Sequence, residues 1–216
     1  MNKIINNFNK IKSNIENSKL SHDVKIIAIS KTFPLEHIKP LIDHGHNHFG
    51  ENKVQEATAK WTELKNKNPK IKLHMVGKLQ TNKAKDAVKL FDYVHSLDSK
   101  KLADILVKQE KNLNKKLKYF IQVNIGKEIQ KSGISISELE PFFNYCKYEV
   151  KLDVVGSMII PPNDHNTQTY FKSLYELNKS IGLKELSMGM SADYLEAAKY
   201  GSTFVRIGSS IFGERS

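Results

Sequence analysis

The sequence is poor in cysteine and in long apolar runs. Its single cysteine, Cys146, excludes an intrachain disulfide. The first residues carry no hydrophobic core of a secretory signal, and no apolar stretch approaches the roughly 20 residues that cross a membrane. We therefore expect a cytoplasmic, reducing setting and no membrane partner.

Clustered basic charge is also missing. The chain has 34 lysine and arginine residues against 23 acidic ones, a formal net charge of +11. Such a balance is typical of proteins that bind polyanions, but these lysines are interleaved with acids, asparagine and isoleucine over the whole length. There is no arginine cluster and no aromatic-rich nucleic-acid motif, so we expect no nucleic-acid partner.

What the chain does have is a regular alternation of strand and helix patterns. Its 216 residues, of which 39% are hydrophobic, suffice for one domain, and no linker or low-complexity tract divides residues 1–216. The pattern predicts eight strands, at 24–30, 46–50, 71–76, 93–97, 119–124, 152–158, 185–188 and 203–207. It predicts seven helices between them, at 35–43, 53–66, 82–90, 100–112, 137–148, 166–181 and 192–200.

A further helix precedes the first strand, because four apolar residues fall on one helical face: Ile4, Phe8, Ile11 and Ile15. Eight strand–helix units predict an α/β fold, a single (β/α)8 TIM barrel with an additional N-terminal helix. A doubly wound open sheet is the competitor, but it usually has fewer strands and a glycine-rich first turn. In a barrel the residues that follow the strands form the active site, and the last two loops commonly hold a phosphate.

Lys31 stands directly after the first predicted strand. The residues before it are apolar and often β-branched, and Pro34 begins the next helix. A lysine at the end of a buried strand can be partly desolvated, which lowers its pKa and leaves a fraction of the amine neutral and nucleophilic. Such an amine can condense with an aldehyde. The plain alternative is a lysine on a solvated face.

Only two of the basic residues are arginine, and Arg206 lies inside the apolar run of the eighth strand. Guanidinium is planar, stays protonated, and carries a fixed fork of donors that an ammonium group does not have. Followed by Gly208 and Ser209, Arg206 indicates a group aimed at a planar, anionic or phosphorylated ligand. The alternative is a structural arginine that caps a neighbouring loop.

Small polar residues follow the last two predicted strands. Ser191 precedes a predicted helix, so it can act as the N-cap while the free N–H groups behind it point toward an anion. Gly208 lets the backbone approach a ligand closely, and Ser209 adds a hydroxyl and another N–H group. These residues predict a phosphate-binding cup.

His44, His46 and His48 alternate before the second strand, so two of them share one face, as metal ligands do. Nothing else in the segment completes a ligand set. We expect a solvated, histidine-rich turn and no metal site.

The residues at the strand ends, in this order, resemble those of the pyridoxal 5′-phosphate (PLP) homeostasis protein family, which is similar to the barrel domain of alanine racemase without its second domain. The departures at Val76, Lys78 and Ser157 touch none of the implied cofactor contacts. The matching segments span residues 28 to 213: Ala28-Ile-Ser-Lys-Thr32, Phe49-Gly-Glu-Asn52, His74-Met-Val-Gly-Lys-Leu-Gln-Thr-Asn-Lys83, Lys131-Ser-Gly133, Leu186-Ser-Met-Gly-Met-Ser191 with Asp193, and Gly201-Ser-Thr-Phe-Val-Arg-Ile-Gly208 through Phe212-Gly213.

The resemblance implies a set of cofactor contacts. Lys31 would form the internal aldimine, a Schiff base, with the C4′ aldehyde of PLP, while Ser191, Gly208 and Ser209 would hold the phosphate. Arg206 would face the pyridine nitrogen. A permanently cationic donor there disfavours protonation of the ring nitrogen, so the ring becomes a weaker electron sink.

The resemblance also implies what the protein does. Asn52 would lie beside the ring. Alanine racemase takes its other acid/base from a second domain and a partner subunit, and this chain ends at Ser216 without such a domain. We therefore expect a PLP-binding homeostasis protein, a monomer, without efficient amino-acid catalysis, which could deliver PLP to PLP-dependent apo-enzymes. The alternatives are a PLP-dependent enzyme such as an amino-acid racemase, or a barrel that acts on a phosphorylated metabolite without PLP.

Overall fold

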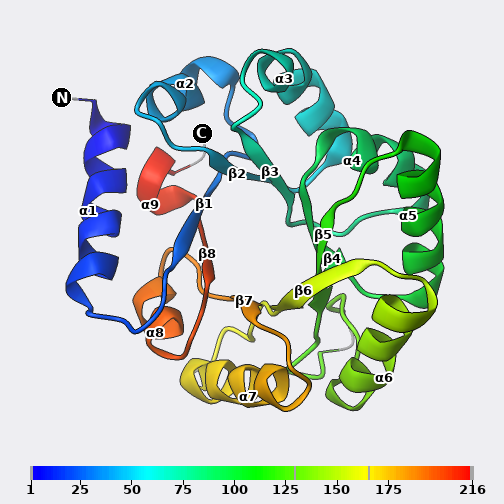
Figure 1. Ribbon diagram of the computed structural model, residues 1–216. Helices are drawn as coiled ribbons and strands as arrows, with labels where there is room; N and C mark the ends of the chain where they lie inside the picture. The colour runs from blue at the N-terminus through cyan, green and yellow to red at the C-terminus, as the bar shows by residue number, and fades with distance from the viewer. Residues whose placement is uncertain (1, 129, 165, 215–216) are drawn as a thin grey trace.

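Eight parallel strands close into one barrel in the computed structural model, which describes residues 2–128, 130–164 and 166–214. Sequential strands are neighbours, and the last strand pairs with the first, as Figure 1 shows. The expected (β/α)8 barrel is confirmed. The strands are β1 (Lys25–Ile29), β2 (His48–Glu51), β3 (Lys72–Met75), β4 (Tyr93–Leu97), β5 (Lys118–Gln122), β6 (Asp153–Met158), β7 (Glu185–Ser187) and β8 (Phe204–Ile207).

Helices surround the barrel, and short helical turns join some of them to the strands. None of the helices in the described ranges is both long and apolar enough to cross a membrane. The helices are α1 (Lys3–Asn17), α2 (Leu35–Asp43), α3 (Val54–Lys67), α4 (Ala84–Leu90), α5 (Lys100–Leu113), α6 (Leu139–Asn144), α7 (Thr167–Ser180), α8 (Tyr194–Lys199) and α9 (Ser209–Phe212). The turns are the 3₁₀ segments η1 (Thr81–Lys83) and η2 (Ile136–Glu138) and the π-helical segment η3 (Tyr145–Glu149).

The predicted elements match the observed ones to within about two residues, with two exceptions. The helix expected at 137–148 divides into η2, α6 and η3, so Cys146 lies in a π-helical turn rather than in the middle of an α-helix. The short helix α9 was not predicted. Its four residues are too few to show a helical period.

The N-terminal helix α1 packs on the outside of the barrel, as expected. Its four apolar residues are all buried: Ile4, Phe8, Ile11 and Ile15. The Asn7 side-chain amide donates to the carbonyl of Ile211 at 3.1 Å, and the Asn14 amide donates to the Tyr194 hydroxyl at 3.0 Å. Helix α1 therefore supports α8 and α9, the two helices that flank β8.

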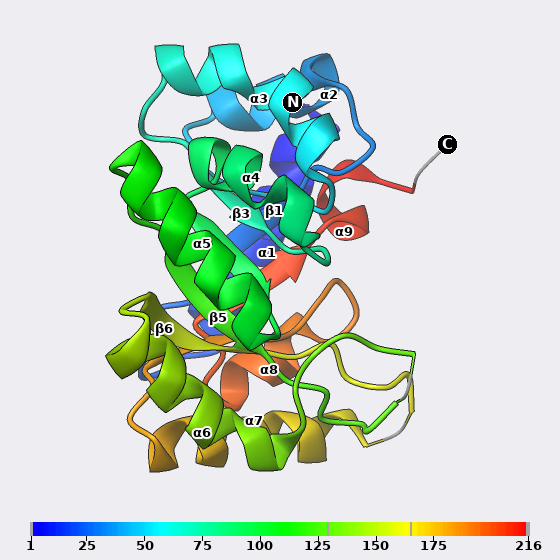
Figure 2. The ribbon, with the colours of Figure 1, turned by 90° about the vertical axis from the view of Figure 1, so that its right-hand side faces the viewer.

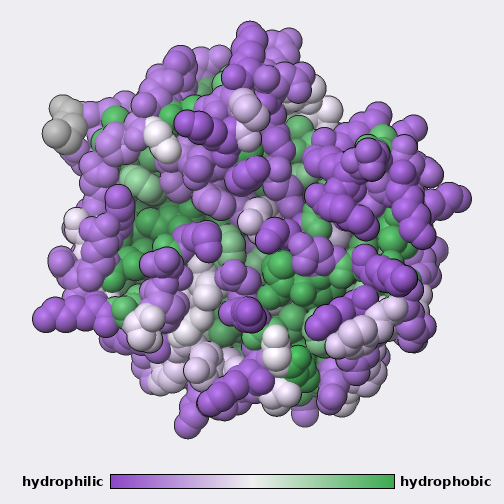
Figure 3. Space-filling model, in the orientation of Figure 1, coloured by the Kyte–Doolittle hydropathy of each residue, from purple (hydrophilic) through white to green (hydrophobic). Residues whose placement is uncertain are grey.

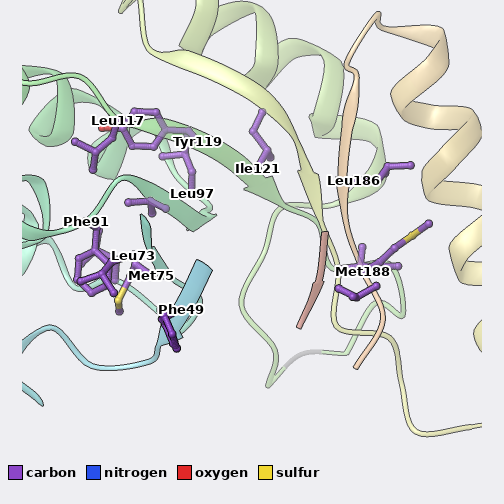
Figure 4. Close-up of a cluster of buried hydrophobic side chains, with 14 of the residues drawn as sticks. Phe49, Leu73, Met75, Phe91, Leu97, Leu117, Tyr119, Ile121, Leu186 and Met188 are labelled. Atoms are coloured by element: carbon purple, nitrogen blue, oxygen red, sulfur yellow. The ribbon is translucent and has the colours of Figure 1, made fainter. Parts of the chain in front are cut away.

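The apolar core has two layers, because alternate side chains of a strand point to opposite faces. The larger layer fills the space between strands and helices, where Figure 4 shows Phe49, Leu73 and Met75 together. A small second layer inside the barrel comprises Ile27, Ile29, Phe120, Met158 and Phe204. The surface in the view of Figure 3 is mainly polar at its rim, with apolar side chains nearer the centre.

The carboxyl ends of the strands meet at one mouth of the barrel. Figure 2 shows the loops after β5 and β6 on the same side as α9. This mouth holds the residues that follow the strands, so the candidate ligand-binding residues are expected there.

Candidate functional site

Lys31 lies in a tight turn at the end of β1. The Phe33 N–H group donates to the Ser30 carbonyl at 3.2 Å, which closes a four-residue turn with Lys31 in its second position. Thr32, in the third position, has φ = 70°, a left-handed conformation that is unfavourable for a β-branched residue. Strain of this kind is concentrated at functional sites. Lys31 is half-buried.

Ser30 is fixed by a buried carboxylate on the neighbouring strand. The Ser30 N–H group donates to Gly50 O at 3.0 Å, and its hydroxyl donates to Glu51 Oε1 at 2.7 Å. The same Oε1 atom accepts from Lys60 Nζ and from Trp61 Nε1, both at 2.9 Å. Lys60 Nζ also donates to Ser30 O at 2.8 Å. Glu51 and Lys60 therefore hold the backbone immediately before Lys31 against β2 and α3.

The loop after β8 lies directly beside the end of β1. Strand β8 pairs with β1 through Ala28 and Ile207, and a Cβ atom at Gly208 would lie 3.4 Å from Ile29 O and Ile29 Cβ. The ring of Phe33 packs against that of Phe212, with centroids 5.4 Å apart. The fold therefore brings Gly208 next to Ile29, two residues before Lys31.

The two serines of the predicted phosphate cup meet. Ser209 Oγ donates to Ser191 Oγ at 3.2 Å, and the Ser210 N–H group donates to Ser191 Oγ at 3.4 Å. Gly189 makes the sharp bend before Ser191, with φ = 89°, and a Cβ atom there would fall 2.5 Å from Ala197 Cβ.

The expected N-cap role of Ser191 is wrong. Helix α8 begins at Tyr194, so its N-cap is Asp193, and Asp193 Oδ1 accepts from the Met190 N–H group at 2.6 Å. The Asp193 carboxylate bonds backward to Met190 and, within the described part of the chain, makes no side-chain capping bond to α8. The Ser191 hydroxyl faces Ser209 and the start of α9 instead.

Arg206 is buried inside the barrel, with an exposed fraction of 5%. Its NH1 group donates to Ser187 O at 2.7 Å and to Ser187 Oγ at 2.8 Å, and its NH2 group donates to Ile159 O at 2.8 Å. Burial lowers the pKa of Arg206 to about 10, and Asp193 opposes that shift. The group remains cationic at neutral pH. These bonds use three of its five N–H donors within the described residues, which leaves two for a ligand.

Asn52 lies at the end of β2, beside the loop after β3. Its Oδ1 atom is buried and has no hydrogen-bond partner among the described residues. Asn52 lines a cavity of about 300 Å³ together with Lys53 and Lys83, next to the N-terminus of α3. The placement of Asn52 beside the cofactor ring thus stays a prediction.

The expectation of a solvated histidine turn holds for the exposed His44 but is wrong for His48. His48 Nδ1 is hydrogen bonded to His74 Nε2 at 2.9 Å inside the barrel, and His46 Nε2 contacts His48 O at 2.8 Å. His74 and His95 are fully buried in the same interior. In the sequence His74 stands out only as the start of a matching segment, and neither histidine is predicted to have a role. The three histidines come from neighbouring strands, and their contact could be predicted only from the register between those strands.

Comparison with known proteins identifies the family. The whole chain, residues 1–216, matches the family described as alanine racemase, N-terminal domain. The pyridoxal phosphate homeostasis protein of Pasteurella multocida is 40% identical over 202 residues, which cover 89% of this chain and 87% of the relative. That of Aquifex aeolicus is 38% identical over 200 residues, 88% of this chain and 87% of the relative.

Solved structures of similar proteins have the same barrel fold. PipY of Synechococcus elongatus PCC7942, with PLP bound, is 34% identical with a TM-score of 0.84, and the match covers 97% of this chain and 100% of that chain. An alanine racemase of Clostridium difficile has a TM-score of 0.73 at 18% identity over 99% of this chain and 57% of that chain, which shows a shared fold. With its closed barrel and its whole length matched, this chain belongs to the alanine racemase N-terminal domain family and, within that family, to the pyridoxal phosphate homeostasis proteins.

Proposed function

We propose that this protein binds PLP at the carboxyl mouth of the barrel, on Lys31, and serves intracellular PLP homeostasis. The observation that carries the proposal is the position of Lys31. Lys31 is half-buried on a strained turn after β1, and β1 pairs with β8, the strand that precedes Gly208 and Ser209. The PLP-bound PipY structure, similar over 97% of this chain, supports the same cofactor.

The residues at the mouth match the chemical groups of PLP. PLP supplies an aldehyde that an amine can attack and a pyridine ring that withdraws electrons. The adjoining hydroxyls of Ser191 and Ser209, 3.2 Å apart, suit a phosphate group. The two remaining donors of Arg206 suit the ring nitrogen, and the unpartnered buried oxygen of Asn52 suits a polar contact with the ligand or a water beside it.

We further propose that residues 1–216 act as one cytoplasmic PLP-binding unit that stores or delivers the cofactor without efficient amino-acid catalysis. A permanent cation at the ring nitrogen limits the electron withdrawal on which such catalysis depends. PLP-dependent apo-enzymes are the proposed recipients, and a monomer is the proposed state. The names of the relatives describe homeostasis, which supports a role in binding.

Loading with PLP tests the binding. Purified protein incubated with PLP should develop a visible absorption band that survives dialysis. Reduction with borohydride, followed by peptide mass spectrometry, should locate the added mass on Lys31. A preparation that stays colourless after loading would refute the proposal, and so would a reduced protein that carries PLP only on other lysines.

Hydrogen exchange tests the absence of efficient catalysis. The loaded protein should exchange the α-hydrogens of amino acids with deuterium no faster than free PLP does, because Arg206 weakens the ring as an electron sink. Proton NMR of a panel of amino acids in deuterated buffer measures this. Exchange well above the rate with free PLP would favour the racemase-like enzyme instead.

A further inference from the structure

Three histidine rings form a continuous hydrogen-bonded line through the barrel interior. His48 Nδ1 contacts His74 Nε2 at 2.9 Å, and His74 Nδ1 contacts His95 Nε2 at 2.9 Å. His95 Nδ1 contacts Ser187 Oγ at 2.9 Å, and Ser187 Oγ accepts from Arg206 NH1 at 2.8 Å. The line therefore runs from the first residue of β2, across β3, β4 and β7, to Arg206 on β8.

This polar line occupies positions that barrels usually fill with branched apolar side chains. Aromatic rings hold its members in place. His74 stacks on Tyr93 with centroids 4.3 Å apart, and His95 stacks on Phe120 with centroids 4.2 Å apart. His74, His95 and Ser187 are fully buried. Burying polar groups costs free energy unless each has a hydrogen-bond partner, so a buried chain of this kind requires that all its groups are paired.

Burial favours the neutral forms of His74 and His95, the two fully buried rings. Burial is the main cause that lowers the pKa of His74 and of His95 well below the ordinary range. The cation of Arg206 lowers that of His95 further. Burial, with the charges of Lys25 and Lys72, lowers the pKa of His48 to about 4, against a small opposing effect of Asp92. A neutral imidazole has one N–H donor and one acceptor nitrogen. Each ring therefore accepts a hydrogen bond from one neighbour and donates to the other, and all the bonds in the line point the same way.

Arg206 sets that direction, because a guanidinium group can only donate. Ser187 Oγ accepts from Arg206, so its own hydrogen is directed to His95 Nδ1. His95 then carries its proton on Nε2 and donates to His74 Nδ1, and His74 donates from Nε2 to His48 Nδ1. The reverse direction would give Ser187 Oγ two donors and leave its hydrogen without an acceptor among the described residues.

We propose that Ser187, His95, His74 and His48 form one polarised hydrogen-bond chain that orients Arg206 toward the ligand. Ser187 is the positioning residue. It binds NH1 through both its carbonyl and its hydroxyl, and so turns the two remaining N–H donors of the guanidinium toward the mouth. The part of this proposal that concerns the ligand rests on the proposed PLP site, while the direction of the chain does not.

Nitrogen NMR of ¹⁵N-labelled protein without PLP tests the direction. The side-chain spectra should show His48, His74 and His95 as neutral rings that all carry the proton on Nε2. In Ser187→Ala the Nδ1 resonance of His95 should shift, because that nitrogen loses its donor. Ser157→Ala is the matched control, since Ser157 is equally buried but points away from the barrel interior to Asn178. An Nδ1–H tautomer at any of the three rings would overturn the direction.

The spectrum of the PLP-loaded protein tests the positioning. Ser187→Ala should shift the visible absorption maximum in the same sense as Arg206→Ala but by less, and Ser157→Ala should leave it unchanged. If Arg206→Ala shifts the maximum and Ser187→Ala does not, the positioning role is refuted while the proposed PLP site stands. If Arg206→Ala leaves the spectrum of bound PLP unchanged, the arginine is not at the ring and the ligand part of the proposal fails with it.

Discussion

Replacing Lys31 with alanine should abolish covalent attachment of PLP. Lys31 is the amine that the fold holds at the mouth, on the turn closed by Ser30 and Phe33. The variant should lose the absorption band of the Schiff base and the mass added by borohydride. It should still retain some PLP by the proposed phosphate contacts at Ser191 and Ser209, whose mutual hydrogen bond does not involve Lys31. Absorbance and peptide mass spectrometry after reduction measure the first effect, and PLP retained on dialysis measures the second.

Lys78→Ala is the matched control, because Lys78 is an exposed lysine at the same mouth. It should leave the attachment at the level of the unchanged protein. Covalent PLP in Lys31→Ala at that same level would mean that another lysine is the point of attachment. Loss of all PLP in the Lys78→Ala protein would likewise contradict the assignment.

Replacing Glu51 with alanine should destabilise the protein by about 3 kcal/mol or more, the usual cost of removing one partner from a buried ion pair. The carboxylate is fully buried and accepts from Ser30, Lys60 and Trp61. Lys60, with an 11% exposed side chain, would keep a charge without its partner. For a chain of this size the melting temperature should fall by about 6 to 12 °C, as calorimetry measures.

Two further variants make this test specific. Glu63→Ala removes an exposed glutamate from α3, the helix that carries Lys60 and Trp61, and should change stability by no more than about 0.5 kcal/mol. Glu51→Gln keeps the volume and an acceptor oxygen but loses the charge, so its stability should lie between those of Glu51→Ala and the unchanged protein. If Glu51→Ala melts at the temperature of Glu63→Ala, the carboxylate does not hold β1 and β2 against α3.

Much of the fold could be predicted from local patterns. The helix Leu35–Asp43 and the strand Tyr93–Leu97 have the predicted bounds, because apolar periodicity and the flanking residues define both ends. Lys31 and Gly208 also lie at the predicted mouth, since the carboxyl ends of parallel strands share one edge. The contacts of PLP with these residues remain predictions.

The errors have physical causes that a single sequence conceals. Ser191 and Asp193 are both good N-cap residues two positions apart, and the local pattern does not decide between them. The histidine line depends on the register of four strands, because side chains from His74 and His95 meet only when their strands are set at the observed stagger. Strand patterns give the alternation of faces but not the stagger between neighbours.

The pairing of β1 with β8 has a consequence for synthesis. The amine on the first strand leaves the ribosome long before the arginine and glycine of the last strand, and domains complete their folding only when all their parts have emerged. A nascent chain therefore exposes Lys31 before the last strand can pair with β1. The folded mouth therefore forms only after β8 has left the ribosome and docked against β1.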